Sequence, residues 1–175
     1  LEYFKQMDQI NQALHGQQNS EDILREVLES AFSIFQCDCA WLVSPCDPES
    51  PGFRIQVGKT APKYAGLFPV GIDLPMHPAI AYFARILKNK ETAITFGEQG
   101  QSLPSDLTST SGIQSSLGMI FHPRGEDRWM FGLHQCSYPR VWSSGEIRLF
   151  QEIGRRLRDA LERMFSEKML RRINR

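Results

Sequence analysis

The stretch that decides the fold is Trp129-Met-Phe-Gly-Leu-His-Gln-Cys-Ser-Tyr-Pro-Arg-Val-Trp-Ser-Ser-Gly-Glu146. Its first half is apolar enough for a buried strand, and Pro139-Arg140 then turns the chain. Ser143 or Ser144 is placed to cap a helix, and Glu146 suits the N-terminus of that helix by its charge. The stretch therefore predicts a buried strand, a corner and the start of a helix that can run to the last residue.

Upstream of this stretch the sequence predicts further strands joined by turns. Apolar runs at 113–122 and 128–137 are the best candidates for central strands. The runs 39–43 and 53–57 predict an antiparallel hairpin with one solvent-exposed face. A short strand is expected at 91–96. Because neighbouring strands are linked by turns, the sheet should be antiparallel and the fold class α+β.

Helical periodicity appears near the N-terminus and in the middle of the chain. Apolar residues recur every three or four positions over 1–15 and 20–35, with Ser20 as the expected N-cap of the second helix. A third helix is expected at 78–87, whereas 58–75 is expected to be irregular. With the C-terminal helix, this predicts a central antiparallel sheet of about five to six strands, helices packed against it, and long N- and C-terminal helices.

Two apolar stripes run along the C-terminal helix. They consist of Phe150, Ile153, Leu157, Ala160 and Met164, and of Leu161, Phe165, Met169 and Ile173. Packing on the chain's own sheet and pairing with a second copy both produce this period. Beyond Met164 pairing is the favoured interpretation, because the sheet is expected to end there. The terminal helices thus predict a homodimer.

Length and composition fit one globular domain. The chain has 175 residues, of which 41% are hydrophobic and 23% charged, which suffices for a single core. We divide it into an N-terminal helix (1–18), a core (19–142) and a C-terminal helix (143–175). The chain begins with Leu1 and stops within a helical pattern, so we expect it to be a piece of a longer protein.

The charge balance and the apolar runs limit the partners. Lys plus Arg number 20, as do Asp plus Glu, so no net charge draws the chain to nucleic acid or to an anionic membrane. The basic residues of the last helix alternate with acidic ones, as on a solvated face. No apolar run approaches the roughly 18 residues of a membrane span. We expect no nucleic-acid partner, no membrane contact by this chain, and a cytoplasmic location.

Neither the cysteines nor the sequence motifs predict catalysis or metal binding. Cys37 and Cys39 share one face of a predicted strand, Cys46 lies in the turn after it, and Cys136 lies on another strand. The thiols are therefore expected to be reduced and not to meet, and no CxxC pair suggests zinc. Nucleophile-elbow, phosphate-loop and HExxH motifs are all missing from the sequence, so the domain itself is not expected to be an enzyme.

Two segments resemble GAF domains, the small-molecule-binding modules of bacterial sensor kinases and phytochromes. Segment 64–75 resembles the phytochrome segment that ends in Asp-Ile-Pro. Segment 131–140, Phe-Gly-Leu-His-Gln-Cys-Ser-Tyr-Pro-Arg, resembles the phytochrome strand before a Pro-Arg turn, and GAF domains beside histidine kinases share it. The resemblance covers roughly 19–165 and implies a GAF fold, a two-component system and flanking signalling helices.

The resemblance does not extend to the covalent bilin site. In phytochromes a Cys-His pair precedes the glycine that opens the next strand, and its cysteine holds the bilin. The positions before Gly112 that correspond are Leu103-Pro104, without a thiol, and Ser137-Tyr138 replaces the family's second histidine. Asp73 does match the family aspartate that lies over the bilin. Covalent bilin is therefore not expected, and the cofactor stays unknown.

The candidate ligand site lies between the sheet and residues 58–87. It consists of Trp41, Asp73, His77, Phe83, Gln114, Ser116 and His134, which combine apolar walls with a few polar groups. His77, at the start of a helix, is either a ligand contact or a capping residue. His134 is either a pocket donor or a hydrogen-bonded core histidine, and it shares a strand face with Cys136, opposite Leu133 and Gln135.

Two functions remain open for the domain. The first is a regulatory sensor that binds an unidentified small molecule and acts on an output domain, such as a histidine kinase, through a dimeric helix. The alternative is a ligand-free dimerisation or spacer module in a multidomain signalling protein. A cavity above roughly 300 Å³ with several polar groups favours the sensor, and a filled interior favours the spacer.

Overall fold

The computed structural model describes residues 2–16, 19–66 and 69–174, where a six-stranded sheet combines with five α-helices. The strand order is β3-β2-β1-β6-β5-β4, and every neighbouring pair is antiparallel. The predicted α+β class and antiparallel sheet are confirmed. The elements are α1 (Glu2–His15), α2 (Ser20–Phe35), β1 (Cys39–Ser44), β2 (Gly52–Thr60), the 3₁₀ helix η1 (Pro62–Tyr64), β3 (Asp73–Pro75), α3 (Pro78–Leu87), β4 (Ile94–Phe96), α4 (Ser105–Thr110), β5 (Ser115–Phe121), β6 (Trp129–Gln135) and α5 (Ser144–Ile173).

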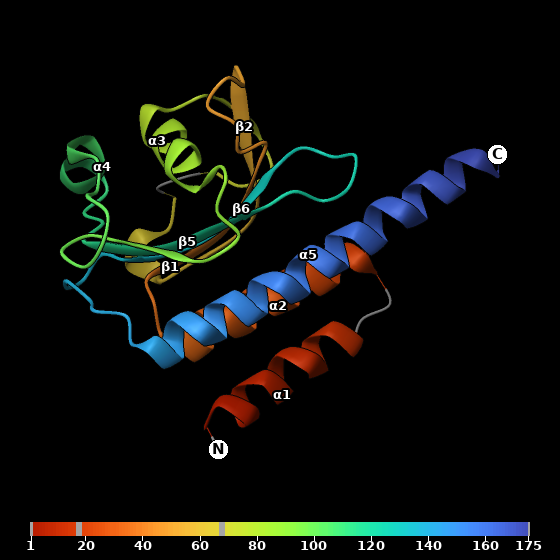
Figure 1. Ribbon diagram of the computed structural model, residues 1–175, viewed down its shortest axis with the longest axis horizontal. Helices are drawn as coiled ribbons and strands as arrows, with labels where there is room; N and C mark the ends of the chain where they lie inside the picture. Colours follow the sequence, from red (N-terminus) through yellow and green to blue (C-terminus); the bar gives the residue numbers. More distant parts are fainter. Residues whose placement is uncertain (1, 17–18, 67–68, 175) are drawn as a thin grey trace.

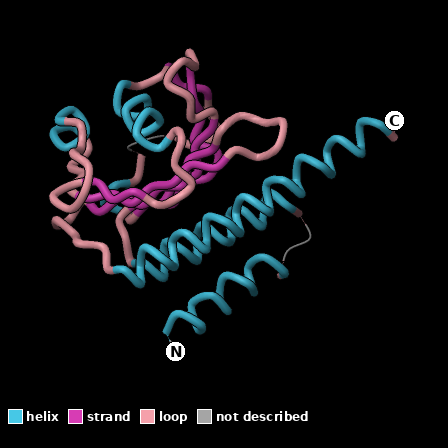
Figure 2. The backbone as a smooth tube through the Cα atoms, in the orientation of Figure 1, coloured by secondary structure: helices cyan, strands magenta, loops and turns pink. Residues whose placement is uncertain are grey.

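The helices cover both faces of the sheet (Figure 1). Helices α2 and α5 lie side by side across one face, and α1 packs on their outer side. Helices α3 and α4 lie on the opposite face, together with most of the loops (Figure 2). The sheet therefore separates two apolar cores, one under α2 and α5 and one under α3.

The core under α2 and α5 is here called the helix-side core. It joins α1, α2 and α5 to the strand residues that point toward them, such as Leu42, Leu117 and Leu133. The Phe131 and Phe150 rings stack at 4.3 Å between centroids. A Cβ added at Gly154 would come within 2.2 Å of the Met119 sulfur, so α5 lies as close to β5 as its backbone allows.

The core under α3, here called the chamber-side core, takes the alternate residues of the same strands. Trp41 and Val43 of β1 and Met130 of β6 belong to it, as do Phe83 and Leu87 of α3. Both faces of β1 are consequently buried. The solvent-exposed face predicted for the first hairpin is therefore absent from β1, whereas in β2 Arg54 and Gln56 are half-buried and alternate with buried Phe53 and Ile55.

Several predicted boundaries need correction. The central strands are shorter than the runs 113–122 and 128–137, and Asn19, not Ser20, caps α2 through its side chain. Strand β3 lies in the segment 58–75, which was expected to be irregular. This three-residue strand is held by its pairing with β2, so no local period marks it. The predicted division after residue 18 falls beside Gln17 and Gln18, which lie outside the described residues, as does Leu1.

Helix α5 is one unbroken helix of 30 residues. Ser143 is its N-cap, and with Glu146 it completes a capping box. Its first stripe, from Phe150 to Met164, is buried in the helix-side core. This part of α5 therefore packs within its own chain and not against a second copy. Beyond it Met169, Leu170 and Ile173 are exposed, on an end that projects past the rest of the domain in Figure 1.

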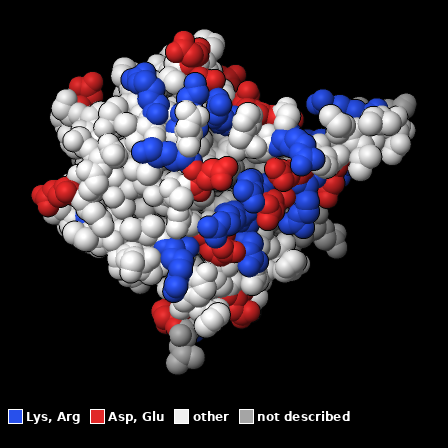
Figure 3. Space-filling view, in the orientation of Figure 1, with Lys and Arg blue, Asp and Glu red and all other residues white. Residues whose placement is uncertain are grey.

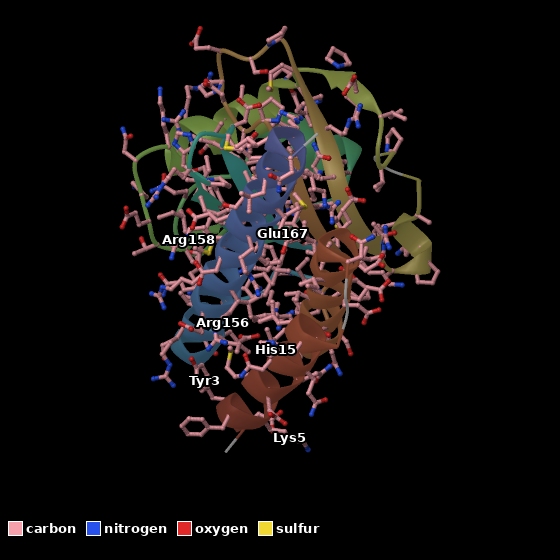
Figure 4. The ribbon with its side chains drawn as sticks, turned by 90° about the vertical axis from the view of Figure 1, so that its right-hand side faces the viewer. Tyr3, Lys5, His15, Arg156, Arg158 and Glu167 are labelled. Carbon is pink, nitrogen blue, oxygen red and sulfur yellow. The ribbon has the colours of Figure 1, made fainter. Side chains whose placement is uncertain are left out.

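Helix α1 is attached to α5 as well as to α2. Its stripe residues Met7, Ile10 and Leu14 are buried, so this stripe is used within the chain. The Arg148 guanidinium lies over the Tyr3 ring at 4.9 Å, and Arg156 donates a hydrogen bond to the Asn11 side chain. Figure 4 shows Tyr3 and Arg156 along the contact of the two helices. The first half of α5 is therefore held on several sides.

Candidate functional site

The candidate site is a small space between the sheet and α3, here called the chamber. Strands β1 and β6 supply its floor, and α3 and α4 contribute its other walls. Its free volume is about 30 Å³, close to the volume that one water occupies in the liquid. The residues that line it are Trp41, Val43, Phe53, Ile55, Ile80, Phe83, Leu107, Ile113, Met130 and His134.

Three predicted site residues meet at the chamber: Trp41, Phe83 and His134. Trp41 and His134 come from the central strands, and Phe83 comes from the buried face of α3, with its ring centroid 6.2 Å from that of His134. Gly58, opposite Trp41 on β2, makes room for the indole, because a Cβ there would lie 2.7 Å from the ring. These contacts place an aromatic wall around one imidazole.

His134 is the polar group of the chamber lining, and Ser116 holds it. The two residues are directly opposite on β6 and β5, and Ser116 Oγ lies 2.6 Å from His134 Nδ1. Burial lowers the pKa of His134 to about 4, so the ring is neutral at neutral pH. One ring nitrogen is thus engaged by the hydroxyl. The expected shared face of His134 and Cys136 is found, since both lie on the chamber side.

The other predicted site residues lie apart from the chamber lining. Asp73 is exposed in β3 and forms an ion pair with Arg54 at 2.9 Å. His77 is an exposed N-cap of α3, and its Nδ1 accepts a hydrogen bond from the Ala79 amide at 3.0 Å, which corresponds to the capping interpretation. Gln114 is exposed and donates to the Cys136 carbonyl at 3.0 Å. The structure does not bring these three side chains to the same space as Trp41.

A half-buried carboxylate, Asp38, joins the start of β1 to the end of β6. It accepts hydrogen bonds from the amides of Cys136 at 2.7 Å and Ser137 at 2.8 Å. It also accepts from the Ser137 hydroxyl and, at 3.1 Å, from the Gln135 side chain. Carboxylates with several donors hold their neighbours firmly, because each of these hydrogen bonds is charge-assisted. Asp38 therefore fixes the point at which the chain leaves the sheet.

Arg140 continues this network to α5. Its guanidinium donates to the Phe35 carbonyl at 2.7 Å and to the Gln135 side-chain oxygen at 2.9 Å, and it forms an ion pair with Glu146. The same guanidinium lies 4.3 Å from the centre of the Trp142 ring. Glu146 is also the N3 residue of the α5 capping box. One arginine thus connects the sheet, α2 and the first turn of α5.

Sequence reasoning missed the residues of this connection. Pro139-Arg140 was recognised as a turn and as part of a family resemblance, and Glu146 as a helix-start residue, but no role was assigned to Arg140, Asp38 or Gln135. The Pro-Arg signal could have pointed to Arg140. For Asp38 there was no local signal, because its partners lie 97 to 99 positions away in the chain.

The cysteines depart from one expectation, that Cys37 and Cys39 share a face. Cys37 lies in the helix-side core, whereas Cys39 lies in the chamber-side core. The prediction failed because β1 begins at Cys39, so the alternation of the strand does not extend back to Cys37. Cys136, which follows β6, belongs to the same core as Cys39.

A larger depression lies elsewhere on the surface. It has a volume of about 720 Å³ and runs between the α3–β4 connection, the end of β5 and the middle of α5. Lys88, Lys90, Arg155, Arg158 and Glu162 are among its lining residues. Figure 3 shows basic and acidic side chains interleaved along the band that α5 crosses. This groove is polar and mixed in charge, and it shares no lining residue with the chamber.

Residues 2–16, 19–66 and 69–174 contain neither a candidate metal site nor a candidate membrane span. Nowhere in these ranges do three or more His, Cys, Asp or Glu side chains form a group suited to a metal ion. No helix within them is both long enough and apolar enough to cross a membrane.

Comparison with known proteins places the fold. The family model for the GAF domain matches residues 19–161. No curated protein matches the chain by sequence. Among solved structures, the phycoerythrobilin-bound GAF domain from a cyanobacterial phytochrome is similar with a TM-score of 0.74 and 13% identity, over 95% of this chain and 98% of that one.

Two further structures show that the same fold occurs in different proteins. The GAF domain from a phosphoenolpyruvate-protein phosphotransferase of Coxiella burnetii has a TM-score of 0.68 at 14% identity, over 95% of this chain and 96% of that one. The chromophore-binding domain of the Stigmatella aurantiaca bacteriophytochrome has a TM-score of 0.72 at 12% identity, over 92% of this chain and 60% of that one. At these identities the likeness concerns the fold.

Proposed function

Because the chain belongs to the GAF domain family, whose members are regulatory modules of signalling proteins, we propose that it passes changes at the chamber to an attached output domain through α5. The observation that supports this most strongly is the polar network that runs from Asp38 through Gln135 and Arg140 to Glu146. It links the two central strands of the sheet to the first turn of the longest helix.

The network can carry a displacement because its members are packed and share partners. His134 lines the chamber, and the next residue, Gln135, donates to Asp38 and accepts from Arg140. A shift of β6 along its axis would therefore move the partners of Arg140. Since Arg140 also binds Glu146 in the α5 capping box, the same shift acts on the root of α5.

Helix α5 is suited to transmit such a shift over a distance. Its first half is held against the sheet at Gly154 and stacked on Phe131 through Phe150, and its last turns project past the domain. A continuous helix conveys rotation or translation of its root to its tip. The output domain that we propose at that end, by resemblance to the family, is a histidine kinase of a bacterial two-component system.

For a small-molecule input, the proposed contacts are Trp41, Phe83 and His134, with Ser116 orienting the imidazole. The aromatic wall with one imidazole suits a small, mainly apolar ligand that carries one hydrogen-bonding group. Any ligand larger than a water must displace side chains of α3 or of the strands, because the chamber has only about 30 Å³ free. Entry would thus be coupled to movement of the chamber walls, which is what a sensor requires.

The second candidate function is a ligand-free spacer. The same small volume favours it, because the interior between α3 and the sheet is well filled without a ligand. In this version α5 receives no signal from the chamber, and the Arg140 network only fixes the geometry between neighbouring domains. The two candidates differ in one measurable property, the response of α5 to occupation of the chamber.

The proposed assembly is a homodimer through the projecting end of α5. Met169, Leu170 and Ile173 are 64%, 58% and 71% exposed there, and apolar residues at this spacing suit helix pairing. Replacement of Met169 and Ile173 by Lys should convert a dimer into a monomer in analytical ultracentrifugation, without loss of helicity. Phe4→Lys is the matched control, since Phe4 is a 75% exposed apolar residue on α1. Dimers that survive the α5 substitutions would contradict the assembly.

Native mass spectrometry of the protein purified from its own host tests the input. The sensor version predicts a retained small molecule, and the added mass should be absent in Phe83→Trp, which fills the chamber. Hydrogen exchange at residues 144–150 should then differ between loaded and empty protein. A ligand-free protein that shows no thermal shift with a metabolite library would favour the spacer, and unchanged exchange at the α5 root on loading would contradict the proposed coupling.

A further inference from the structure

The outer edge of β5 is left open where β4 begins. Strand β4 pairs with β5 only at residues 116–118, whereas β6 pairs with β5 along its whole length. If β4 extended one residue further back, Ala93 would lie opposite Met119. The Ala93 amide instead donates to the Gln151 side chain of α5 at 3.1 Å, so the chain has left the sheet at this point. Among the residues that the structure describes, no strand pairs with this edge of β5 at 119–121.

This open edge lines the polar groove of about 720 Å³, here called the β5–α5 groove. Residues 119–121 line it from the sheet, and Gly154, Arg155 and Arg158 line it from α5. An unpaired strand edge presents backbone N–H and C=O groups with which another extended segment can pair. The volume is within the range of roughly 300–1,000 Å³ that is usual for ligand sites. The groove therefore combines backbone hydrogen-bonding groups with room for a short stretch of chain.

The charge of the β5–α5 groove favours an acidic occupant. Its lining contains five Lys and Arg side chains but only two Glu side chains. The three arginines already pair with carboxylates that lie outside the lining. Lys88 and Lys90 are exposed in the α3–β4 connection, and neither forms an ion pair with a residue that the structure describes. Their two ammonium groups are thus free to bind the carboxylates of a partner.

A nucleic acid suits this groove less well than an acidic peptide does. Single strands bind by stacking on aromatic rings as well as by charge, and Phe121, the phenyl ring of the lining, is buried. Glu91 and Glu162 would also repel a continuous row of phosphates. Alternate side chains of an extended peptide point to opposite faces, so its carboxylates can lie at the lysines and away from these glutamates.

We propose that the β5–α5 groove binds an acidic segment of a partner protein as an added strand on the edge of β5 at 119–121. The backbone of the segment pairs with β5, and its carboxylates lie against Lys88 and Lys90. Because α5 approaches β5 most closely at Gly154, the added strand contacts both elements. The groove shares no lining residue with the chamber, so this binding requires no ligand in the chamber.

The test is a titration of the full chain with the fluorescent peptide Glu-Val-Glu-Val-Glu-Val-Glu, followed by fluorescence anisotropy. Lys88→Glu/Lys90→Glu should weaken binding about tenfold, because the variant turns attraction into repulsion at the groove. The matched control Lys5→Glu/Lys59→Glu makes the same change of net charge at exposed lysines outside the groove. It should alter the affinity less than about twofold, because solvent and salt screen distant surface charges.

Two further measurements separate strand addition from simple charge attraction. The same peptide with every amide nitrogen methylated keeps its carboxylates but has no backbone donor, so it should bind about tenfold more weakly. With the unmodified peptide at about ten times its Kd, amide hydrogen exchange at 119–121 should slow about tenfold, because opening of this edge requires release of the peptide.

Several results would overturn the proposal. One is a peptide that does not bind, and another is equal weakening by the groove variant and its control. Equally tight binding of the methylated peptide, or unchanged exchange at 119–121, would contradict an added strand. A single-stranded oligothymidylate of the same charge that binds more tightly than the peptide would assign the groove to nucleic acid instead.

Discussion

The two faces of the sheet differ in how they are covered and filled. The helix-side core is closed by three helices, with large rings stacked at 4.3 Å. The chamber-side core lies under the ten-residue helix α3 and borders a buried imidazole and about 30 Å³ of free space. One face anchors α5, and the other contains the groups that can bind, titrate or react. The difference suggests a division between a rigid mount and a responsive interior.

The largest expected effect compares the same residue type in the two cores. Phe150→Ala should lower the free energy of unfolding by about 5 kcal/mol, because the sheet and α2 fix α5 and the cavity cannot collapse. Phe83→Ala should cost about 3 kcal/mol, because α3 can settle onto the sheet. Urea unfolding measures both, and Phe83 is 3% exposed against 0% for Phe150, so burial is matched. Equal costs would remove the proposed contrast between the cores.

The second effect concerns protonation within the chamber-side core. Because the pKa of His134 is about 4 in the folded state and about 6.5 unfolded, the unfolded chain binds more protons between these values. The free energy of unfolding should therefore be unaffected by His134 above about pH 6.5. It should fall by about 3 kcal/mol as the pH is lowered to 4, because the unfolded chain binds the proton more tightly. His134→Gln should flatten this part of the pH profile relative to wild type. Identical profiles would show that the imidazole is solvated, contrary to its burial in the folded protein.

The third effect tests the connection between the two regions. Arg140→Ala should cost about 2–3 kcal/mol, because it leaves Glu146, the Phe35 carbonyl and Gln135 without their shared donor. Arg140→Lys keeps the charge but lacks the planar fork, so it should recover only part of the loss. Both variants should increase hydrogen exchange in the first turns of α5. Full recovery by lysine would mean that charge alone, without the fork geometry, suffices.

The smallest effect examines the root of α5. Ser143→Ala removes the side-chain oxygen that accepts from the Glu146 amide at 3.1 Å, and it should cost about 1 kcal/mol. The neighbouring Ser144→Ala is the control and should be neutral within about 0.5 kcal/mol, since Ser144 is exposed and lies past the cap. Thermal unfolding distinguishes the two. A larger loss for Ser144→Ala than for Ser143→Ala would reassign the cap.

The predictable part of the molecule is the part that local spacing encodes. Alternation in β6 is enough to separate Leu133 from His134, and the periods of three and four locate α2, α3 and α5. Strand alternation placed His134 on one face, and helical spacing placed Phe83 inward; with Trp41 they were chosen as candidate site residues, and the chamber brings the three together. In the strand–turn–helix stretch 129–146, the Pro-Arg corner and the Ser–Glu cap depend only on residues that are close together in the sequence. They could therefore be predicted.

The remaining features depend on pairs that lie far apart in the chain. The meeting of Asp38 with Gln135 follows from the register between β1 and β6, which a one-residue slip would abolish. The placement of Asp73 and His77 outside the chamber depends in the same way on the short strand β3 and on the position of α3. Sequence periodicity determines which face a side chain takes, but only the assembled sheet decides which side chains meet there, because contact distance is set by register and packing and not by spacing along the chain.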